Sequence, residues 1–146
     1  MLCQQNNSYP ILNAMAKQIL VIEDDQIMRE LIRDFLKEKN FDIIAKNDGK
    51  EALDWLEGNL PDLIICDIQM PNIDGKTFLR KVRQRGFTKR TPVVILSGSQ
   101  NKSEDRIAFY QEGAQDFLIK PFNPYELLEV VKKNISPLHY DYDRKW

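Results

Sequence analysis

The sequence predicts a single α/β domain in which a parallel sheet is covered by helices on both faces. Short blocks of strong β-forming residues recur five times, and segments with helical spacing lie between them. Strict alternation with short connections is typical of parallel strands joined by right-handed crossovers. A chain of 146 residues is long enough to bury one core of this kind. Five strand–helix units therefore predict a doubly wound sheet of five strands with five helices.

The predicted strands are short, and each ends at or just before a polar or charged residue. In chain order they are QILVIE (18–23), DIIAK (42–46), DLIIC (62–66), PVVILS (92–97) and DFLIK (116–120). The third is a continuous apolar run followed by Asp67, and such a run is typical of a strand buried on both faces of its sheet. A carboxylate there is expected at the carboxyl edge, where open α/β sheets bind their ligands.

The first two predicted helices place apolar residues at the spacing of a helix with one face on the core. The core-facing residues of the first are Met28, Leu31, Ile32, Phe35 and Leu36. The second begins with Asp48 and Glu51, whose spacing is that of a capping box. Its apolar face consists of Ala52, Leu53 and Leu56.

The remaining three helices differ in their expected anchoring. The third has an apolar face of Phe78, Leu79 and Val82, and the fifth one of Leu127, Leu128, Val131 and Ile135. The fifth begins at Asn123, an N-cap residue, followed by Pro124. The fourth has a poorer stripe of Ile107, Ala108 and Tyr110 and ends at Gly113, a left-handed cap. A weakly anchored helix is the easiest one to move.

Composition argues against several classes of protein. The net charge of −1, from 21 basic and 22 acidic residues, gives no overall field toward nucleic acid or membranes. We interpret the basic stretch 76–90 as the solvated face of a helix and its loop. Cys3 and Cys66 are too few for a disulfide framework or a zinc site, which favours a reducing compartment. Without a membrane-spanning run or a signal peptide, we expect a cytoplasmic protein that binds neither membranes nor nucleic acid directly.

Polar residues mark the ends of four predicted strands. The residues are Glu23, Asp24 and Asp25 at the first strand, Asp67 at the third, Ser97 at the fourth and Lys120 at the fifth. Because parallel strands end at one edge of the sheet, these side chains are expected to gather there. Clustered carboxylates raise one another's pKa unless a cation lies among them. Two or three carboxylates with waters and a backbone carbonyl suit Mg²⁺.

Four segments at these strand ends, VIEDD, CDIQMPNIDG, VVILSGS and DFLIKPF, resemble the receiver domain of two-component response regulators. The resemblance covers residues 17–136. It leaves residues 1–16 as an N-terminal extension expected to be flexible, and residues 137–146 as a short C-terminal tail. It implies a flavodoxin-like fold with strand order 2-1-3-4-5 and a stand-alone, chemotaxis-type receiver.

The resemblance also implies a metal site and a phosphoryl acceptor. Asp67 is the expected acceptor of the phosphoryl group. Mg²⁺ is expected on Asp24, Asp67 and the backbone carbonyl of Gln69, with Glu23 acting through water. Asp25 falls one position past the acidic pair and is expected to open the following loop.

Further residues are expected to act on the phosphoryl group or to respond to it. Lys120 and the hydroxyl of Ser97 are expected to contact it, and Ser97 with Phe117 forms the switch. The resemblance implies a cis Lys120-Pro121 peptide bond, and cis bonds are largely confined to proline. Gln69 and Ser99 are expected to tune the rate of dephosphorylation.

The implied function is phosphorelay signal transduction. The donor is expected to be a sensor histidine kinase or a histidine phosphotransfer protein. The domain would catalyse only its own phosphorylation and dephosphorylation, and in that sense is not expected to be an enzyme. A downstream protein target is expected on the face of the fourth helix and fifth strand, where a homodimer could also form.

Three alternatives stay open at this point. A phosphatase of the haloacid-dehalogenase type also uses an aspartate nucleophile and Mg²⁺, but needs a second aspartate where this chain has Gln69. A flavodoxin needs a phosphate-binding loop after the first strand, where this chain has three acids. The chain could also be the receiver half of a longer transcriptional regulator.

Overall fold

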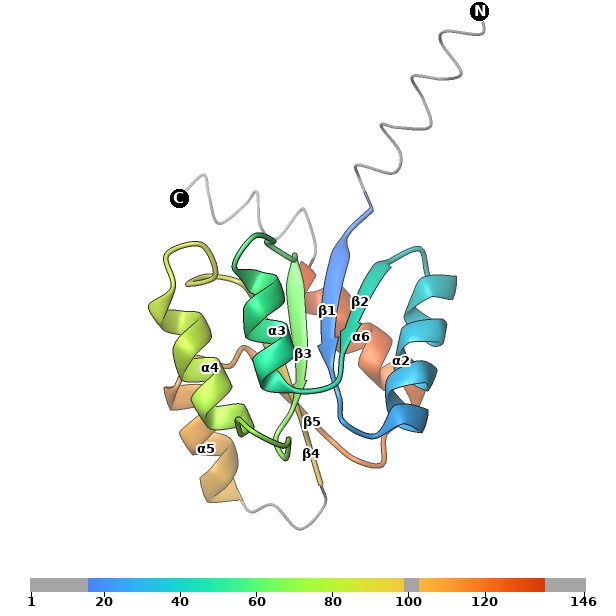
Figure 1. Cartoon of the computed structure of the whole chain (residues 1–146). Helices are drawn as coiled ribbons and strands as arrows, with labels where there is room; N and C mark the ends of the chain where they lie inside the picture. Colours follow the sequence, from blue (N-terminus) through green and yellow to red (C-terminus); the bar gives the residue numbers. More distant parts are fainter. Residues whose placement is uncertain (1–15, 99–102, 136–146) are drawn as a thin grey trace, which may run out of the picture.

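The computed structural model describes residues 16–98 and 103–135 (Figure 1). Nearly all of the predicted N-terminal extension (1–16) and the whole C-terminal tail (137–146) lie outside the described residues, as does Ser99.

Five parallel strands form one sheet in the order β2-β1-β3-β4-β5. They are β1 (Gln18–Ile22), β2 (Asp42–Lys46), β3 (Leu63–Asp67), β4 (Val93–Ser97) and β5 (Asp116–Ile119). Each boundary lies within one residue of the block predicted from the sequence. The flavodoxin-like fold class and its strand order are therefore confirmed.

Five helices cover the two faces of the sheet (Figure 1). They are α2 (Gln26–Glu38), α3 (Gly49–Leu56), α4 (Gly75–Gln84), α5 (Ser103–Gln111) and α6 (Pro124–Ile135). Helices α2 and α6 pack on one face, and α3, α4 and α5 pack on the other. Within the described ranges, every helix is too short or too polar to cross a membrane.

The alternation of side chains along each strand divides the core into two layers. In β1, Ile19 and Val21 pack toward α2 and α6, whereas Leu20 and Ile22 pack toward α3 and α4. Strand β3 is buried along its whole length, including Asp67 at its end. The position of Asp67 is therefore fixed by packing on both faces of the sheet.

Aspartate side chains begin three of the helices at the carboxyl edge of the sheet. Asp25 accepts hydrogen bonds from the amides of Ile27 and Met28 at the start of α2. Asp48 caps α3 by accepting from the amide of Glu51 at 2.9 Å. Asp74 caps α4 in the same way, through the amide of Thr77 at 2.8 Å. Caps of this kind satisfy amides that have no partner within the helix, so these carboxylates have a structural task.

Two predictions about helix faces are wrong. Leu31 is 61% exposed, because Ile32 and Leu36 bury the inner face of α2 and leave Leu31 on its outer flank. In α5, Ile107 and Tyr110 are exposed, and the buried anchor is Phe109. The weak anchoring of α5 that the sequence predicts agrees with this single large buried side chain among its described residues.

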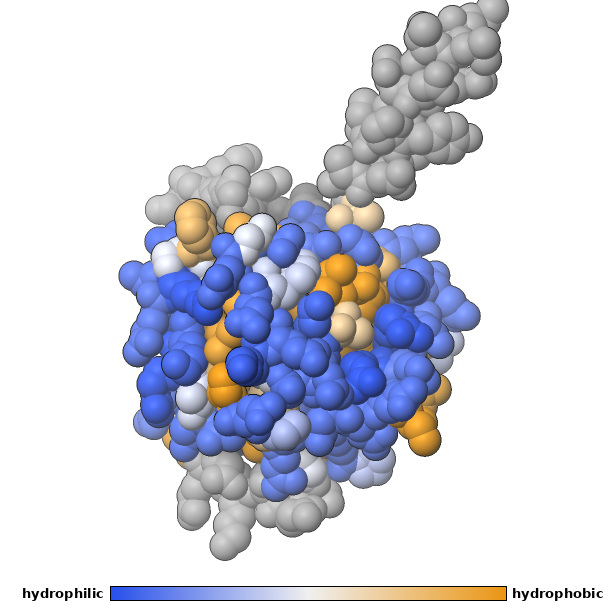
Figure 2. Space-filling model, in the orientation of Figure 1, coloured by the Kyte–Doolittle hydropathy of each residue, from blue (hydrophilic) through white to orange (hydrophobic). Residues whose placement is uncertain are grey.

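Arginines from the basic stretch 76–90 join α4 to the turn between α5 and β5. Arg80 forms an ion pair with Glu112 at 2.8 Å. The guanidinium of Arg83 donates to the carbonyl of Gly113 at 2.8 Å and to the side chain of Gln115 at 2.7 Å. Figure 2 shows a largely hydrophilic surface around α3 and α4, in agreement with a solvated helix face. Arg83 departs from that prediction because it is half-buried and braces the fold.

The turn at Gly113 gives a test of this brace. Gly113 has φ +108°, and a Cβ atom there would lie 2.8 Å from Nε of Arg83. We predict that Gly113→Ala lowers the free energy of unfolding by about 2 kcal/mol, because the backbone is strained and Arg83 must shift. Gly58→Ala is the matched control, since open space surrounds Gly58. Urea unfolding of both variants checks the prediction, and equal values for the two would contradict it.

Candidate functional site

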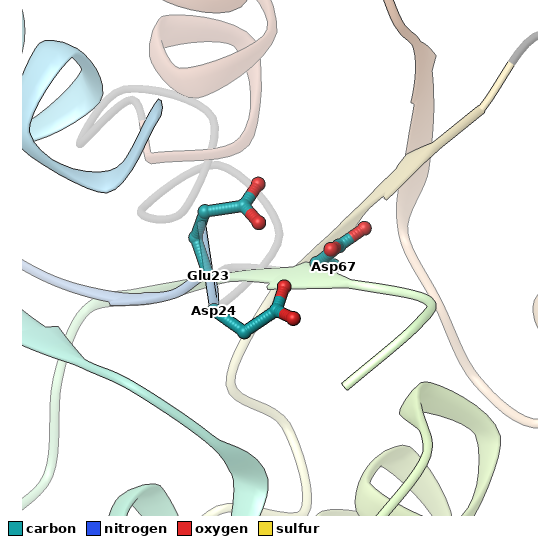
Figure 3. A group of neighbouring side chains, drawn as sticks. All are labelled: Glu23, Asp24 and Asp67. Atoms are coloured by element: carbon teal, nitrogen blue, oxygen red, sulfur yellow. The ribbon is translucent and has the colours of Figure 1, made fainter. Parts of the chain in front are cut away.

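Three carboxylates meet at the carboxyl edge of the sheet. Glu23 and Asp24 directly follow β1, and Asp67 ends β3, the strand paired with β1. Each of the three offers an oxygen atom, and these atoms lie within 4.8 Å of one another. Figure 3 shows the three side chains turned toward the same small volume. Glu23 and Asp67 are buried, whereas Asp24 is exposed to solvent.

Lys120, which directly follows β5, brings a positive charge to these carboxylates. Its Nζ donates a hydrogen bond to Oε1 of Glu23 at 2.7 Å and lies 3.4 Å from Oδ1 of Asp67. Its backbone amide donates to the carbonyl of Ser97, which ties the end of β5 to the end of β4. The Lys120-Pro121 peptide bond is cis.

The balance of burial and charge sets the protonation of this group. Burial raises the pKa of Glu23 to about 7; the hydrogen bond from Lys120 opposes this shift and the nearby charge of Asp67 adds to it. Burial by itself would lower the pKa of Lys120. The hydrogen bond to Glu23 and the charge of Asp67 outweigh it, and the pKa of Lys120 is raised. Lys120 therefore stays charged near neutral pH, while Glu23 is poised to gain or lose a proton.

Ser97 and Phe117 lie on neighbouring strands, β4 and β5. Ser97 is fully buried, and its hydroxyl donates to the carbonyl of Gly98 at 3.2 Å. The Phe117 ring is buried against α5, with ring centroids 6.1 Å from Phe109 and 6.4 Å from Tyr110. The aromatic ring proposed as a switch thus contacts the most weakly anchored helix.

The loop between β3 and α4 carries Gln69, which is exposed two residues after Asp67. The loop returns close to the strand end, because the amide of Gly75 donates to the carbonyl of Ile68 at 2.9 Å. A Cβ atom at Gly75 would lie 3.0 Å from the carbonyl oxygen of Asp67, so a larger residue would push the loop away. Ser99, the other residue expected to tune dephosphorylation, lies outside the described residues.

One residue of this region was missed by the sequence analysis. Arg29, in the first turn of α2, donates from Nη1 to the carbonyl of Glu23 at 2.8 Å. A lone arginine on a helix is usually solvated, and nothing in its local sequence indicates that it reaches back to the acidic loop.

The donor set fits a divalent cation of the Mg²⁺ type. The ligand atoms that Glu23, Asp24 and Asp67 offer are carboxylate oxygens, which Mg²⁺ prefers, and exposed Asp24 leaves room for the waters that this ion retains. Burial raises the pKa of Glu23, and repulsion by the neighbouring charge of Asp67 adds to the shift. A divalent cation would relieve that repulsion.

A doubly wound sheet with an acidic pair, an aspartate and a lysine at its carboxyl edge is the architecture of receiver domains. Residues 19–132 match the sequence profile of the response regulator receiver domain. The chain therefore belongs to the response regulator receiver domain family of two-component signalling systems. This membership does not favour the alternative of a haloacid-dehalogenase phosphatase.

Relatives with known roles fall into two kinds. The chain is 34% identical over 123 residues to the chemotaxis protein CheY of Bacillus subtilis. The match covers 84% of this chain and the whole of CheY. It is also 34% identical over 127 residues to the phosphate regulon transcriptional regulatory protein PhoB of Escherichia coli. That match covers 85% of this chain but 55% of PhoB, so the chain spans about half the length of this longer relative.

Solved structures give the same result. The chemotaxis response regulator CheY4 of Vibrio cholerae superposes with a TM-score of 0.78 at 28% identity, covering 82% of this chain and 99% of CheY4. The receiver domain of sensor histidine kinase PA1611 from Pseudomonas aeruginosa has a TM-score of 0.75 at 28% identity, covering 82% and 98% of the two chains. That structure has a magnesium ion coordinated in its active-site cleft.

The pKa of Glu23 predicts how stability depends on pH in the metal-free protein. Its folded value of about 7 lies above its ordinary value of 4.5, so between these values the folded chain holds more protons than the unfolded chain. Stability from this group is therefore present at low pH and is lost as pH rises toward and through 7. Urea unfolding between pH 5 and 8 should show this loss in wild type but not in Glu23→Gln. If the stability of the two proteins depended on pH in the same way, the raised pKa of Glu23 would be contradicted.

Proposed function

We propose that this chain accepts a phosphoryl group on Asp67 from a phosphohistidine and passes the signal on by changing its surface. The donor would be a sensor histidine kinase or a histidine phosphotransfer protein. The observation that carries the proposal is the meeting of three carboxylates and Lys120 at the end of a fully buried strand. Receiver domains are phosphoacceptors, and they use Mg²⁺ at an acidic pocket.

The proposed reaction transfers the phosphoryl group from an imidazole nitrogen of the donor to a carboxylate oxygen of Asp67. The P–N bond breaks as the new P–O bond forms, the product is an acyl phosphate, and the imidazole leaves with its electron pair. The donor carries its own leaving group and the nucleophile is a carboxylate, so the receiver needs no general base.

The transition state spreads negative charge over three phosphoryl oxygens, and catalysis then consists of positioning and neutralisation. The ammonium of Lys120, 3.4 Å from Asp67, is placed to take one oxygen. The Ser97 hydroxyl, with nearby backbone amides, is proposed to take another. Asp24, Asp67 and the carbonyl of Gln69 would hold Mg²⁺, with Glu23 acting through water, and the ion would supply charge neutralisation.

The proposed response begins when the phosphoryl group draws Ser97 toward it. Phe117 would then move into the vacated space and change its packing against Phe109 and Tyr110 of α5. The structural support is that α5 has one large buried anchor among its described residues, so its position is the easiest to shift. The change is a shift between two populations, set by how differently they contact the phosphoryl group.

The proposed output surface is the face formed by α5 and β5. Ile107, Tyr110 and Ile119 are 56%, 41% and 39% exposed there, which suits a protein target or a second copy of the chain. Receiver domains engage both phosphodonors and downstream targets.

The proposed domain consists of residues 17–136. These bounds are compatible with a stand-alone messenger such as CheY and with the receiver half of a longer regulator such as PhoB. The buried free thiol of Cys66 supports a reducing, cytoplasmic location.

The acceptor is tested by replacing Asp67. We predict that Asp67→Asn takes up no label from acetyl phosphate or from a phosphohistidine donor, because the amide is not a nucleophile of the required strength. Asp74→Asn is the matched control on the same loop, since asparagine also caps helices and this variant should be labelled normally. Stoichiometric acid- or alkali-labile phosphate on Asp67→Asn would refute the assignment. Sustained turnover of a phosphomonoester by wild type would instead favour a phosphatase.

Residues beside the acceptor are predicted to set the lifetime of the phosphorylated state. Gln69→Ala should change the dephosphorylation rate by at most about tenfold, because a neutral amide orients water less effectively than an acid or base does. Ser99→Ala is expected to behave in the same way. Time courses of phosphate loss measure both rates. Rates equal to wild type in both variants would show that neither side chain controls the approach of water.

A further inference from the structure

Arg29 lies in the first turn of α2 and reaches back to the loop that carries the acidic pair. Its Nη1 atom donates to the backbone carbonyl of Glu23 at 2.8 Å and lies 3.4 Å from that of Asp24. The same atom donates to the side-chain oxygen of Asn47 at 2.9 Å. One guanidinium therefore contacts two successive carbonyls after β1 and a side chain after β2.

The Asn47 partner, which directly follows β2, is itself anchored. The backbone amide of Asn47 donates to the carboxylate of Glu51 at 3.1 Å, and this bond attaches the loop after β2 to the first turn of α3. Arg29 thus connects the acidic loop to a second helix start.

The chain between β1 and α2 consists of three acids in succession, Glu23, Asp24 and Asp25. Other hydrogen bonds hold its two ends, from the amide of Glu23 to the carbonyl of Lys46 at 3.2 Å and from the side chain of Asp25 to the start of α2. Arg29 adds a contact to the carbonyls of Glu23 and Asp24 between them.

We propose that Arg29 is a positioning residue, which holds the backbone of Glu23 and Asp24 so that their carboxylates face Asp67 and bind a divalent cation. Arg29 contacts backbone oxygens of the pair, so it would act on the metal only through them. The inference rests on the proposed function in that the site is taken to hold Mg²⁺.

Two effects of Arg29 on the affinity for Mg²⁺ oppose each other. Whether removal of Arg29 weakens or tightens Mg²⁺ binding therefore tests the proposal. As a cation, Arg29 repels a second cation, so its removal would tighten Mg²⁺ binding, and solvent and salt weaken this repulsion. As a positioning residue, its removal would weaken binding, and loss of a group that orients metal ligands typically costs 10–100-fold in affinity. We therefore expect the positioning effect to win.

The test is isothermal titration of the purified proteins with Mg²⁺ alone. Arg29→Met keeps much of the aliphatic stem but removes the donors, and the Mg²⁺ dissociation constant should rise about tenfold. Arg33→Met is the matched control, because it removes a charge from the same helix at a side chain that pairs with Asp34. Its dissociation constant should stay within about twofold of wild type. Unchanged or tighter binding by Arg29→Met would overturn the proposal.

A second variant decides the matter if Arg29→Met does not fold. Arg29→Lys keeps the charge but loses the guanidinium fork, so weaker Mg²⁺ binding supports positioning and wild-type binding contradicts it. Labelling of wild type with acetyl phosphate separates this inference from the proposed function. A wild-type protein that binds Mg²⁺ but takes up no phosphoryl group would refute the function and leave the role of Arg29 standing. A wild-type protein that binds no Mg²⁺ would overturn both.

Discussion

The ammonium of Lys120 between the carboxylates of Glu23 and Asp67 is the interaction on which the site depends. Glu23 is 1% exposed and Asp67 is 7% exposed, and burying two carboxylates side by side is costly unless a cation lies between them. Lys120 is 97 residues from Glu23 in sequence, and its Nζ lies 2.7 Å from Oε1 of that residue. The parallel order β2-β1-β3-β4-β5 places the ends of β1, β3 and β5 at one edge of the sheet, where the Lys120 side chain reaches both carboxylates. The charge balance among Glu23, Asp67 and Lys120 therefore depends on the fold.

The molecule divides into a rigid part and a part that is easier to move, and the site lies between them. Strands β3 and β4 are buried along their whole length, so Asp67 and Ser97 are fixed by packing. Helix α5 has Phe109 as its one large buried side chain in the described part, and its C-terminal turn is held from α4 by Arg80 and Arg83. A change at Ser97 is thus expected to be transmitted through Phe117 to α5. The core would not absorb it.

The sequence predicts the features that depend on local rules. Strand boundaries follow short apolar blocks, and the caps at Asp48 and Asn123 follow from residue type and spacing. The gathering of Glu23, Asp24 and Asp67 follows from parallel strands ending at one edge. Contacts between distant segments were not predictable in this way. Arg29 and Arg83 are indistinguishable in sequence from solvated helix cations, and whether Leu31 or Phe109 is buried depends on the angle at which each helix meets the sheet.

We propose that the carboxylates beside Asp67 form a cation site that the loop after β3 completes. The most direct measurement is a crystal structure grown with Mn²⁺ in place of Mg²⁺, in which anomalous scattering locates the ion without ambiguity. The expected result is one ion bonded to oxygens of Asp24, Asp67 and the backbone of Gln69, with Lys120 moved off Glu23 or sharing it with a metal-bound water. An ion elsewhere, or Lys120 and the three carboxylates unchanged at saturating Mn²⁺, would contradict the claim.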